Sequence, residues 1–171
     1  MEFILLFITI FKIVCYFNIF NKSGERGWKA IIPILDIYIR FKLFYKKKAF
    51  IIYIIILLAL VFSVFMITLC GMELMTYYDG GDPYDPAWMA SIPNQLLNST
   101  TAFFFMFIIC SLIIFIFELI LNYHMTKSFN RGLGFFFGLV FINVVFLAIL
   151  AFFNENTYIG NLTEKNQNIS Y

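Results

Sequence analysis

The sequence predicts an all-α membrane protein with four transmembrane helices, and its composition and hydropathy pattern support this prediction. Of its 171 residues, 62% are hydrophobic and only 13% are charged. Soluble domains usually carry about a quarter charged residues. The apolar residues form continuous blocks near the length of about 20 residues that a helix needs to cross a bilayer. Because the blocks lack the alternation of a membrane β-barrel, we expect helices in one domain over residues 1–153.

Four windows, 3–20, 49–71, 102–125 and 133–153, are apolar enough to span the membrane. The first is not typical of a cleavable signal peptide, because Glu2 precedes it and its positive charges follow it. Residues 154–171 are polar and rich in asparagine, which predicts a tail outside the membrane.

The distribution of positive charge predicts how the helices are oriented. Residues 21–48 contain eight Lys or Arg, whereas residues 76–101 contain none. Basic loops are retained in the cytoplasm, so the first and third loops are expected inside. The second loop, the N-terminus and the C-terminal tail are then expected outside, in a multi-pass protein of the cell membrane.

The segment after Pro33 is both apolar and basic, which favours a cytoplasmic amphipathic helix at the membrane interface between the first two spans. Asp36 and Arg40 fall at i and i+4 on such a helix, in the favourable acid-first order. A short basic connector is the alternative. The residues expected to contact anionic lipid headgroups are Lys46, Lys47, Lys48, Lys127 and Arg131.

Lys12 and Glu118 are the ionisable residues inside the predicted spans, and a charge in hydrocarbon is usually paired or functional. Both are placed roughly 10 to 13 Å from the cytoplasmic edge, so an intramembrane ion pair is one hypothesis. In a second, Lys12 extends to the interface while Glu118 is protonated or hydrated. A third is a proton or ion pathway through Glu118 and His124, although a histidine at headgroup level is usually a solvated residue.

Two glycines begin the last predicted helix. Gly132 and Gly134 lie at its N-terminus beside Lys127 and Arg131, where free N–H groups and cations would suit the phosphate of a lipid headgroup. Gly134 and Gly138 also form a pair of small residues four apart, which lets another helix approach closely. Packing within the chain and dimerisation are both compatible with this spacing.

Two runs, KSGERGWKAIIPILDIY and ELILNYHMTKSFNRGLGFFFGLVFINVVFLAILAFF, resemble an uncharacterised bacterial family of multi-pass membrane proteins, a domain of unknown function with a Gly-x-x-Gly-Trp-x-Ala-x-x-Pro loop. The region is also similar to the N-terminal membrane portion of some proteins labelled signal peptidase I. The matching residues are Gly24, Gly27, Trp28, Pro33, Ser128, Phe129, Gly132 and Gly134. The resemblance implies a membrane fold and topology but no activity. A peptidase of that class needs a serine and a lysine base outside the membrane, and the predicted external segments do not offer that pair.

The sequence gives no motif for a cofactor, a metal, nucleic acid or a catalytic reaction. Its three cysteines lie in apolar blocks without metal-ligand spacing. Asp79, Asp82 and Asp85 lack the spacing of a calcium loop. Glycosylation acceptor triplets begin at Asn98, Asn161 and Asn168 on the predicted external side, but a fourth begins at Asn21 on the cytoplasmic side.

We therefore expect a small non-enzymatic membrane protein that acts as an accessory, scaffold or immunity-type partner of another membrane component. The alternative is an oligomeric transporter or channel subunit that uses Lys12 and Glu118. A membrane-embedded enzyme acting on lipids is a third possibility, with only His124 and Glu118 as acid–base groups. The expected partners are the bilayer and another membrane protein or a second copy of the chain.

Overall fold

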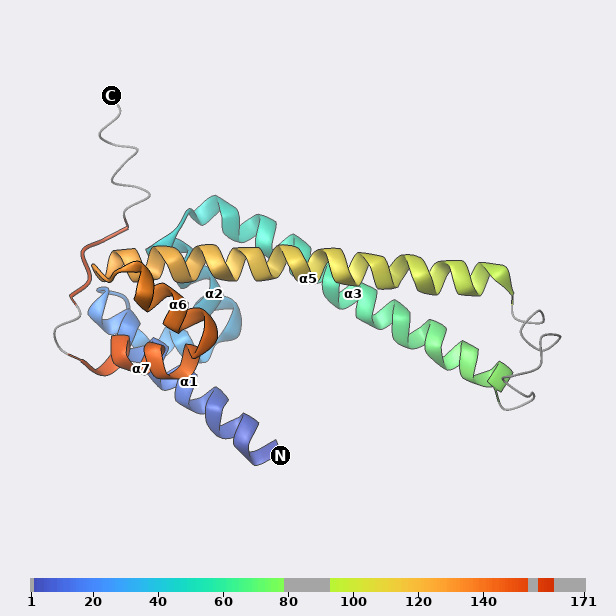
Figure 1. Ribbon diagram of the computed structural model, residues 1–171, viewed down its shortest axis with the longest axis horizontal. Helices are drawn as coiled ribbons and strands as arrows, with labels where there is room; N and C mark the ends of the chain where they lie inside the picture. The colour runs from blue at the N-terminus through green and yellow to red at the C-terminus, as the bar shows by residue number, and fades with distance from the viewer. Residues whose placement is uncertain (1, 79–92, 154–156, 162–171) are drawn as a thin grey trace, which may run out of the picture. The chain divides into compact units, whose positions relative to one another are not determined.

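The computed structural model describes residues 2–78, 93–153 and 157–161, and within these ranges all regular elements are helices. The elements are α1 (Glu2–Lys22), the 3-10 helix η1 (Gly27–Ile31), α2 (Pro33–Phe44), α3 (Lys47–Tyr78), α5 (Asn94–Ser128), α6 (Leu133–Phe141) and α7 (Asn143–Phe152) (Figure 1). Residues 79–92, with the three aspartates considered for calcium, and Asn168 lie outside the described ranges. The all-helical prediction is confirmed.

Three helices, α1, α3 and α5, are long and apolar enough to cross a membrane. They overlap the first three predicted spans, and α3 and α5 extend beyond the predicted windows to 32 and 35 residues. Few of their residues are buried inside the chain: 17% of the most apolar window of α1, and 11% for α3 and α5. Lipid is the natural solvent for the remaining apolar surface.

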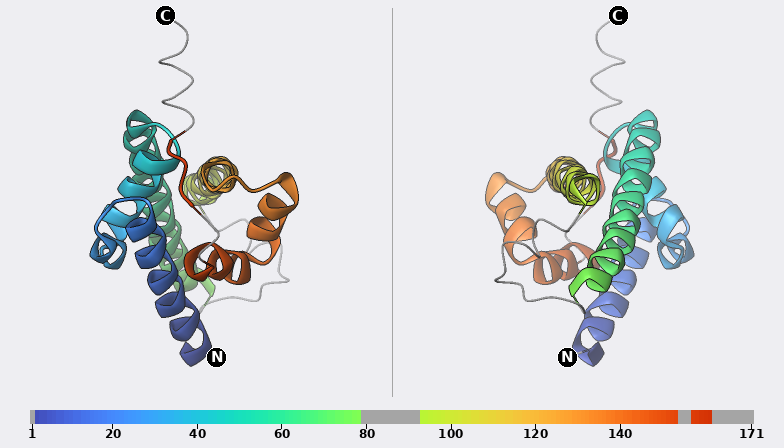
Figure 2. Two further views of the ribbon diagram at one scale, coloured as in Figure 1. Left: turned by 90° about the vertical axis from the view of Figure 1, so that its left-hand side faces the viewer. Right: turned by 90° about the vertical axis from the view of Figure 1, so that its right-hand side faces the viewer.

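The fourth predicted span is not a single helix. Residues 133–153 form α6 and α7, of nine and ten residues, which are joined at a bend (Figure 2). Ile142 leaves the helical conformation, with φ −124° and ψ 55°. The side chain of Asn143 donates to the carbonyl of Leu139 at 3.1 Å, and so bonds a carbonyl next to the break. Hydropathy identified the segment as apolar but did not reveal this break.

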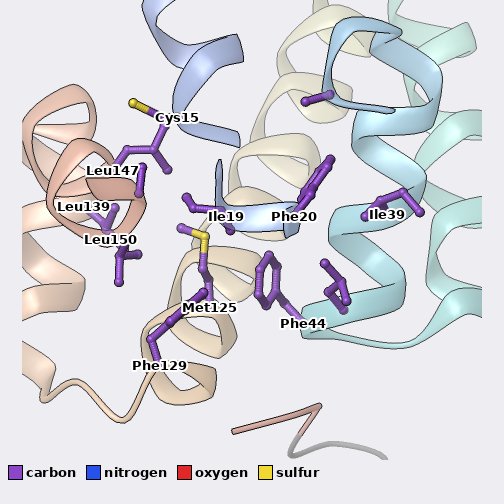
Figure 3. Packing of buried hydrophobic residues seen from close by; sticks show 13 residues of the cluster. Cys15, Ile19, Phe20, Ile39, Phe44, Met125, Phe129, Leu139, Leu147 and Leu150 are labelled. Carbon is purple, nitrogen blue, oxygen red and sulfur yellow. The ribbon is translucent and has the colours of Figure 1, made fainter. Parts of the chain in front are cut away.

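The chain divides into two compact units. Unit 1 contains residues 1–51 and 117–171, and unit 2 contains residues 52–116. Unit 1 holds the hydrophobic cluster, which gathers side chains from α1, α2, the end of α5, α6 and α7 (Figure 3). Its fully buried members include Ile19 and Phe20 of α1 and Leu147 and Leu150 of α7. This cluster holds the short helices against the end of α1.

Within the described residues, unit 2 consists mainly of the part of α3 that follows Ile51 and the part of α5 up to Ile116. The rings of Phe62 and Phe103 pack edge to face at 6.2 Å. Ser63 is fully buried, and its hydroxyl donates to the carbonyl of Leu60 at 2.7 Å. Glu73 is the one charged residue among the described residues of this unit.

The helix predicted after Pro33 is present as α2, which begins at Pro33 and ends at Phe44. Proline is well suited to the first helical position, where no intrahelical N–H bond is needed. Ile39, Phe41, Leu43 and Phe44 are buried in unit 1. This helix is therefore packed against the rest of unit 1, which is more than a basic connector requires.

Candidate functional site

A polar cluster lies within unit 1 and is centred on Arg40 of α2. Its Nε atom lies 3.2 Å from Oδ2 of Asp36, one turn earlier on the same helix. Its Nη1 atom lies 3.3 Å from Oε2 and 3.4 Å from Oε1 of Glu118 on α5. One guanidinium thus contacts two carboxylates on two helices, and the planar fork of an arginine holds its donors in fixed directions for such contacts.

The ring of Tyr16 on α1 completes this cluster. The guanidinium carbon of Arg40 lies 5.1 Å from the ring centroid, within cation–π range. Tyr16, Asp36, Arg40 and Glu118 together form what we call the Arg40 bridge, which links α1, α2 and α5. The side chains of Arg40 and Asp36 are only 13% and 16% exposed, whereas that of Glu118 is 35% exposed.

Two carboxylates and one guanidinium give the Arg40 bridge a formal charge of −1 when both acids are ionised. Burial raises the pKa of the Asp36 carboxyl from its ordinary value of 3.8. Arg40 opposes this rise, whereas the neighbouring charge of Glu118 adds to it. The buried Oδ1 atom of Asp36 has no hydrogen-bond partner among the described residues. The bridge is therefore able to accept a proton.

The predicted pair of Lys12 and Glu118 is not formed in the described part of the chain, because Glu118 pairs with Arg40 instead. Lys12 lies one helical turn before Tyr16 on α1, and it forms no ion pair with another described residue. The sequence pattern had placed Arg40 on α2 as a partner of Asp36 alone. Folding α2 back against α5 is what brings its guanidinium to Glu118.

A second cluster ties the loop after α1 to α2. Glu25 accepts from Lys29 at 2.5 Å and also pairs with Lys42 of α2. Hydrogen bonds from both lysines lower the pKa of the Glu25 carboxyl below 4.5. Lys29 and Lys42 are thus engaged with an acid, in contrast to the exposed run Lys46–Lys48 at the start of α3.

The other predicted lipid-facing cations lie near the end of α5. The ammonium of Lys127 lies 5.5 Å from the ring centroid of Tyr123, and the guanidinium carbon of Arg131 lies 5.9 Å from that of Phe135. Lys127 is exposed and Arg131 is half-buried. The ring of His124 lies 5.2 Å from that of Tyr45 and 5.5 Å from that of Tyr123, measured between centroids.

The backbone conformation and packing explain why glycine is needed at both glycine positions of the first motif. Gly24 has φ +80°, a left-handed conformation that favours glycine. At Gly27 a Cβ would lie 2.8 Å from the carbonyl oxygen of Phe17, and its N–H donates to the side chain of Asn21 at 2.9 Å. The motif therefore closes the chain tightly over the end of α1, while Trp28 stays 47% exposed.

The second motif contributes to the core. Ser128 and Phe129 are 1% and 2% exposed at the end of α5. Around Gly134 a Cβ would meet nothing within 4 Å, whereas at Gly138 it would lie 2.3 Å from the ring of Phe146. Gly138 thus serves packing within the chain, between α6 and α7. The structure brings no group of three or more His, Cys, Asp or Glu together as a metal site within the described ranges.

These features define a helical protein with three segments suited to crossing a membrane. Comparisons with protein-family models, curated proteins and solved structures found no match. The resemblance noted from the two motifs remains a prediction. Sequence reasoning missed Tyr16 and the second contact of Arg40, and the only signal for them was an arginine within a helical segment that is largely apolar.

Proposed function

We propose that the chain is a multi-pass protein of the cell membrane that acts as a non-enzymatic accessory, scaffold or immunity-type partner of another membrane component. The observation that carries this proposal is the Arg40 bridge. Its charged groups contact one another and the Tyr16 ring, so they fasten α1, α2 and α5 together. Charged groups that hold helices together favour a structural role, in which the protein presents a fixed helical surface to a partner.

The proposed orientation places residues 21–48 in the cytoplasm, because their eight basic residues would otherwise have to be translocated. Single cysteines can test it in a background with all three native cysteines replaced by alanine. In intact cells an impermeant maleimide should label the Asp82→Cys variant and not the Lys47→Cys variant. The opposite result would reverse the orientation.

Association can be tested by extracting the chain from its source membranes in lipid nanodiscs and determining its stoichiometry by native mass spectrometry. A second chain at a fixed ratio, retained after dilution, is expected. Arg40→Lys is a suitable comparison variant because it keeps the charge but loses the two-sided contact. A chain that stays monomeric under these conditions would count against the proposal.

A second candidate, an oligomeric transporter or channel subunit, is favoured by one observation. Two carboxylates share one guanidinium in the Arg40 bridge, which leaves room for a proton. In such a transporter, the cation paired with Glu118 would be Arg40 and not Lys12. Proton uptake into proteoliposomes, measured with an internal pH dye and abolished by Glu118→Gln, would place this candidate first. Absence of flux in wild-type protein of verified orientation would exclude it.

A further inference from the structure

The segment formed by α6 and α7, residues 133–152, is bonded at its far end to the last residue of α1. The ammonium of Lys22 donates to the carbonyls of Leu150 at 3.0 Å and Phe153 at 2.8 Å. A cation at a helix C-terminus satisfies carbonyls that have no intrahelical donor. The end of α7 therefore lies at the same face of unit 1 as the end of α1.

The described tail residues lie at this face too. The N–H of Ile159 donates to the carbonyl of Ser128, the last residue of α5, at 2.9 Å. The hydroxyl of Tyr158 donates to the carbonyl of Leu43 near the end of α2, also at 2.9 Å. The Asn161 side chain donates to two further carbonyls at the end of α2, those of Lys42 and Tyr45.

The two ends of the α6–α7 segment are too close together for it to cross the bilayer. Ser128, before α6, is bonded to Ile159, and Ile159 follows shortly after Phe153 at the end of α7. Ile159 is only six positions after Phe153, and six extended residues reach about 20 Å. The hydrocarbon core is about 30 Å thick. At 1.5 Å per residue, α6 and α7 are each only about 14 to 15 Å long, roughly half of this thickness.

The bend between the two helices carries the most exposed apolar side chain of the segment, and Leu133 at the start of α6 is also exposed, at 61%. Phe141 is 81% exposed and Ile142 is 56% exposed, and they are flanked by Phe137 at 56% and Val145 at 53%. The start of α6, in contrast, follows the cations Lys127 and Arg131. The apolar bend is suited to contact acyl chains, and the cations before α6 are suited to contact anionic headgroups of the same leaflet.

We propose that the α6–α7 segment is a wedge that enters and leaves the membrane on one face, the face that carries the basic residues 22–48. Its apolar side contacts the acyl chains of that leaflet, and the chain returns to the same face at Thr157–Asn161. This proposal replaces the expected fourth span and external tail. It goes beyond the proposed function, since the wedge forms whether or not another protein associates.

Cysteine labelling distinguishes the wedge from a fourth span. Thr157→Cys lies in the described tail and is exposed, and it can be compared with Lys47→Cys and Asp82→Cys in the cysteine-free background. With the impermeant maleimide we expect Thr157→Cys to follow Lys47→Cys and to differ from Asp82→Cys, both in intact cells and in inverted vesicles. Labelling of Thr157→Cys together with Asp82→Cys would overturn the proposal.

Depth measurements distinguish a wedge from a segment that lies flat on the surface. With Trp28→Phe and Trp88→Phe as background, Phe141→Trp and Leu133→Trp place one indole at the bend and one at the start of α6. Brominated lipids should quench Phe141→Trp severalfold more when bromine lies deep than when it lies near the headgroups, and Leu133→Trp should show the reverse. Equal, shallow quenching of both would overturn the proposal, and Ile142→Trp serves if Phe141→Trp does not fold.

Discussion

Unit 1 and unit 2 both contain long apolar helical segments but are held together differently. Unit 1 contains all four ion pairs of the described residues, the hydrophobic cluster and the glycine at the α6–α7 contact. Unit 2 is two apolar helical segments with one charged residue among those described. In unit 2, runs of apolar residues are enough to predict both described helical segments. In unit 1, side-chain contacts decide where apolar segments bend and which charges meet.

The largest effect is expected at the Arg40 bridge. Arg40→Met leaves Asp36 and Glu118 without their cation and should lower the free energy of unfolding by about 3 kcal/mol, as for other shielded ion pairs broken on one side. Denaturation in detergent micelles measures this loss. Replacing the whole network with Asp36→Asn, Arg40→Met and Glu118→Gln should restore part of it.

Ser63→Ala in unit 2 is the control for this prediction. It removes a buried hydroxyl that bonds its own helix, and should cost about 1 kcal/mol or less. If Arg40→Met were no more destabilising than Ser63→Ala, the contrast between the two units would fail.

The next largest effect is expected at the contact between α6 and α7. Gly138→Ala places a methyl group against the Phe146 ring and should cost about 1 to 3 kcal/mol by overpacking. Gly134→Ala in the same helix meets open space and should be neutral or slightly stabilising. Thermal unfolding of the two variants makes the comparison. Phe146→Leu combined with Gly138→Ala should recover stability, and no recovery would argue against the contact.

Opposite pH dependences are expected for two carboxyls of unit 1. The pKa of Asp36 is raised on folding, so the folded state binds its proton more tightly and stability falls as pH rises from 3.8 through the raised pKa. The pKa of Glu25 is lowered, so its contribution is complete above 4.5 and is lost as pH falls through the lowered pKa. Unfolding midpoints of Asp36→Asn and Glu25→Gln across pH 3 to 7 should each lack the corresponding slope. A wild-type slope in either variant would contradict the assignment.

The smallest effect is expected for Lys12 and Glu118. Because Glu118 pairs with Arg40, a double-mutant cycle of Lys12→Ala and Glu118→Ala should show coupling below about 0.5 kcal/mol. The parallel cycle of Arg40→Ala and Glu118→Ala should show clear coupling. A strong interaction between Lys12 and Glu118 would restore the pairing that the sequence suggested.

Much of the fold was predictable from local pattern. The three long helices follow from runs of apolar residues, and α2 follows from Pro33 and its mixed apolar and basic residues. The break at Ile142 was signalled weakly by Gly138 and Asn143, two poor helix formers in an otherwise apolar window. Hydropathy does not weigh such residues, because it averages over the whole window.

The candidate site was only half predictable. Asp36 and Arg40 are four residues apart, so their contact follows from helical geometry. Glu118 is 78 residues from Arg40 in the chain, and no local pattern links them. Lys12 and Glu118 fall at similar expected depths, but depth does not fix which faces of two helices meet.

The sequence by itself determined that this protein is helical and apolar, with segments that can cross a membrane and one strongly basic stretch. These properties are sums over neighbouring residues, and they need no knowledge of the fold. Only the tertiary structure decided that Arg40 contacts Glu118, that the ring of Phe146 packs against Gly138, and that Tyr158 bonds the end of α2. Such contacts join residues distant in the chain, and they form only where helix packing brings specific faces together.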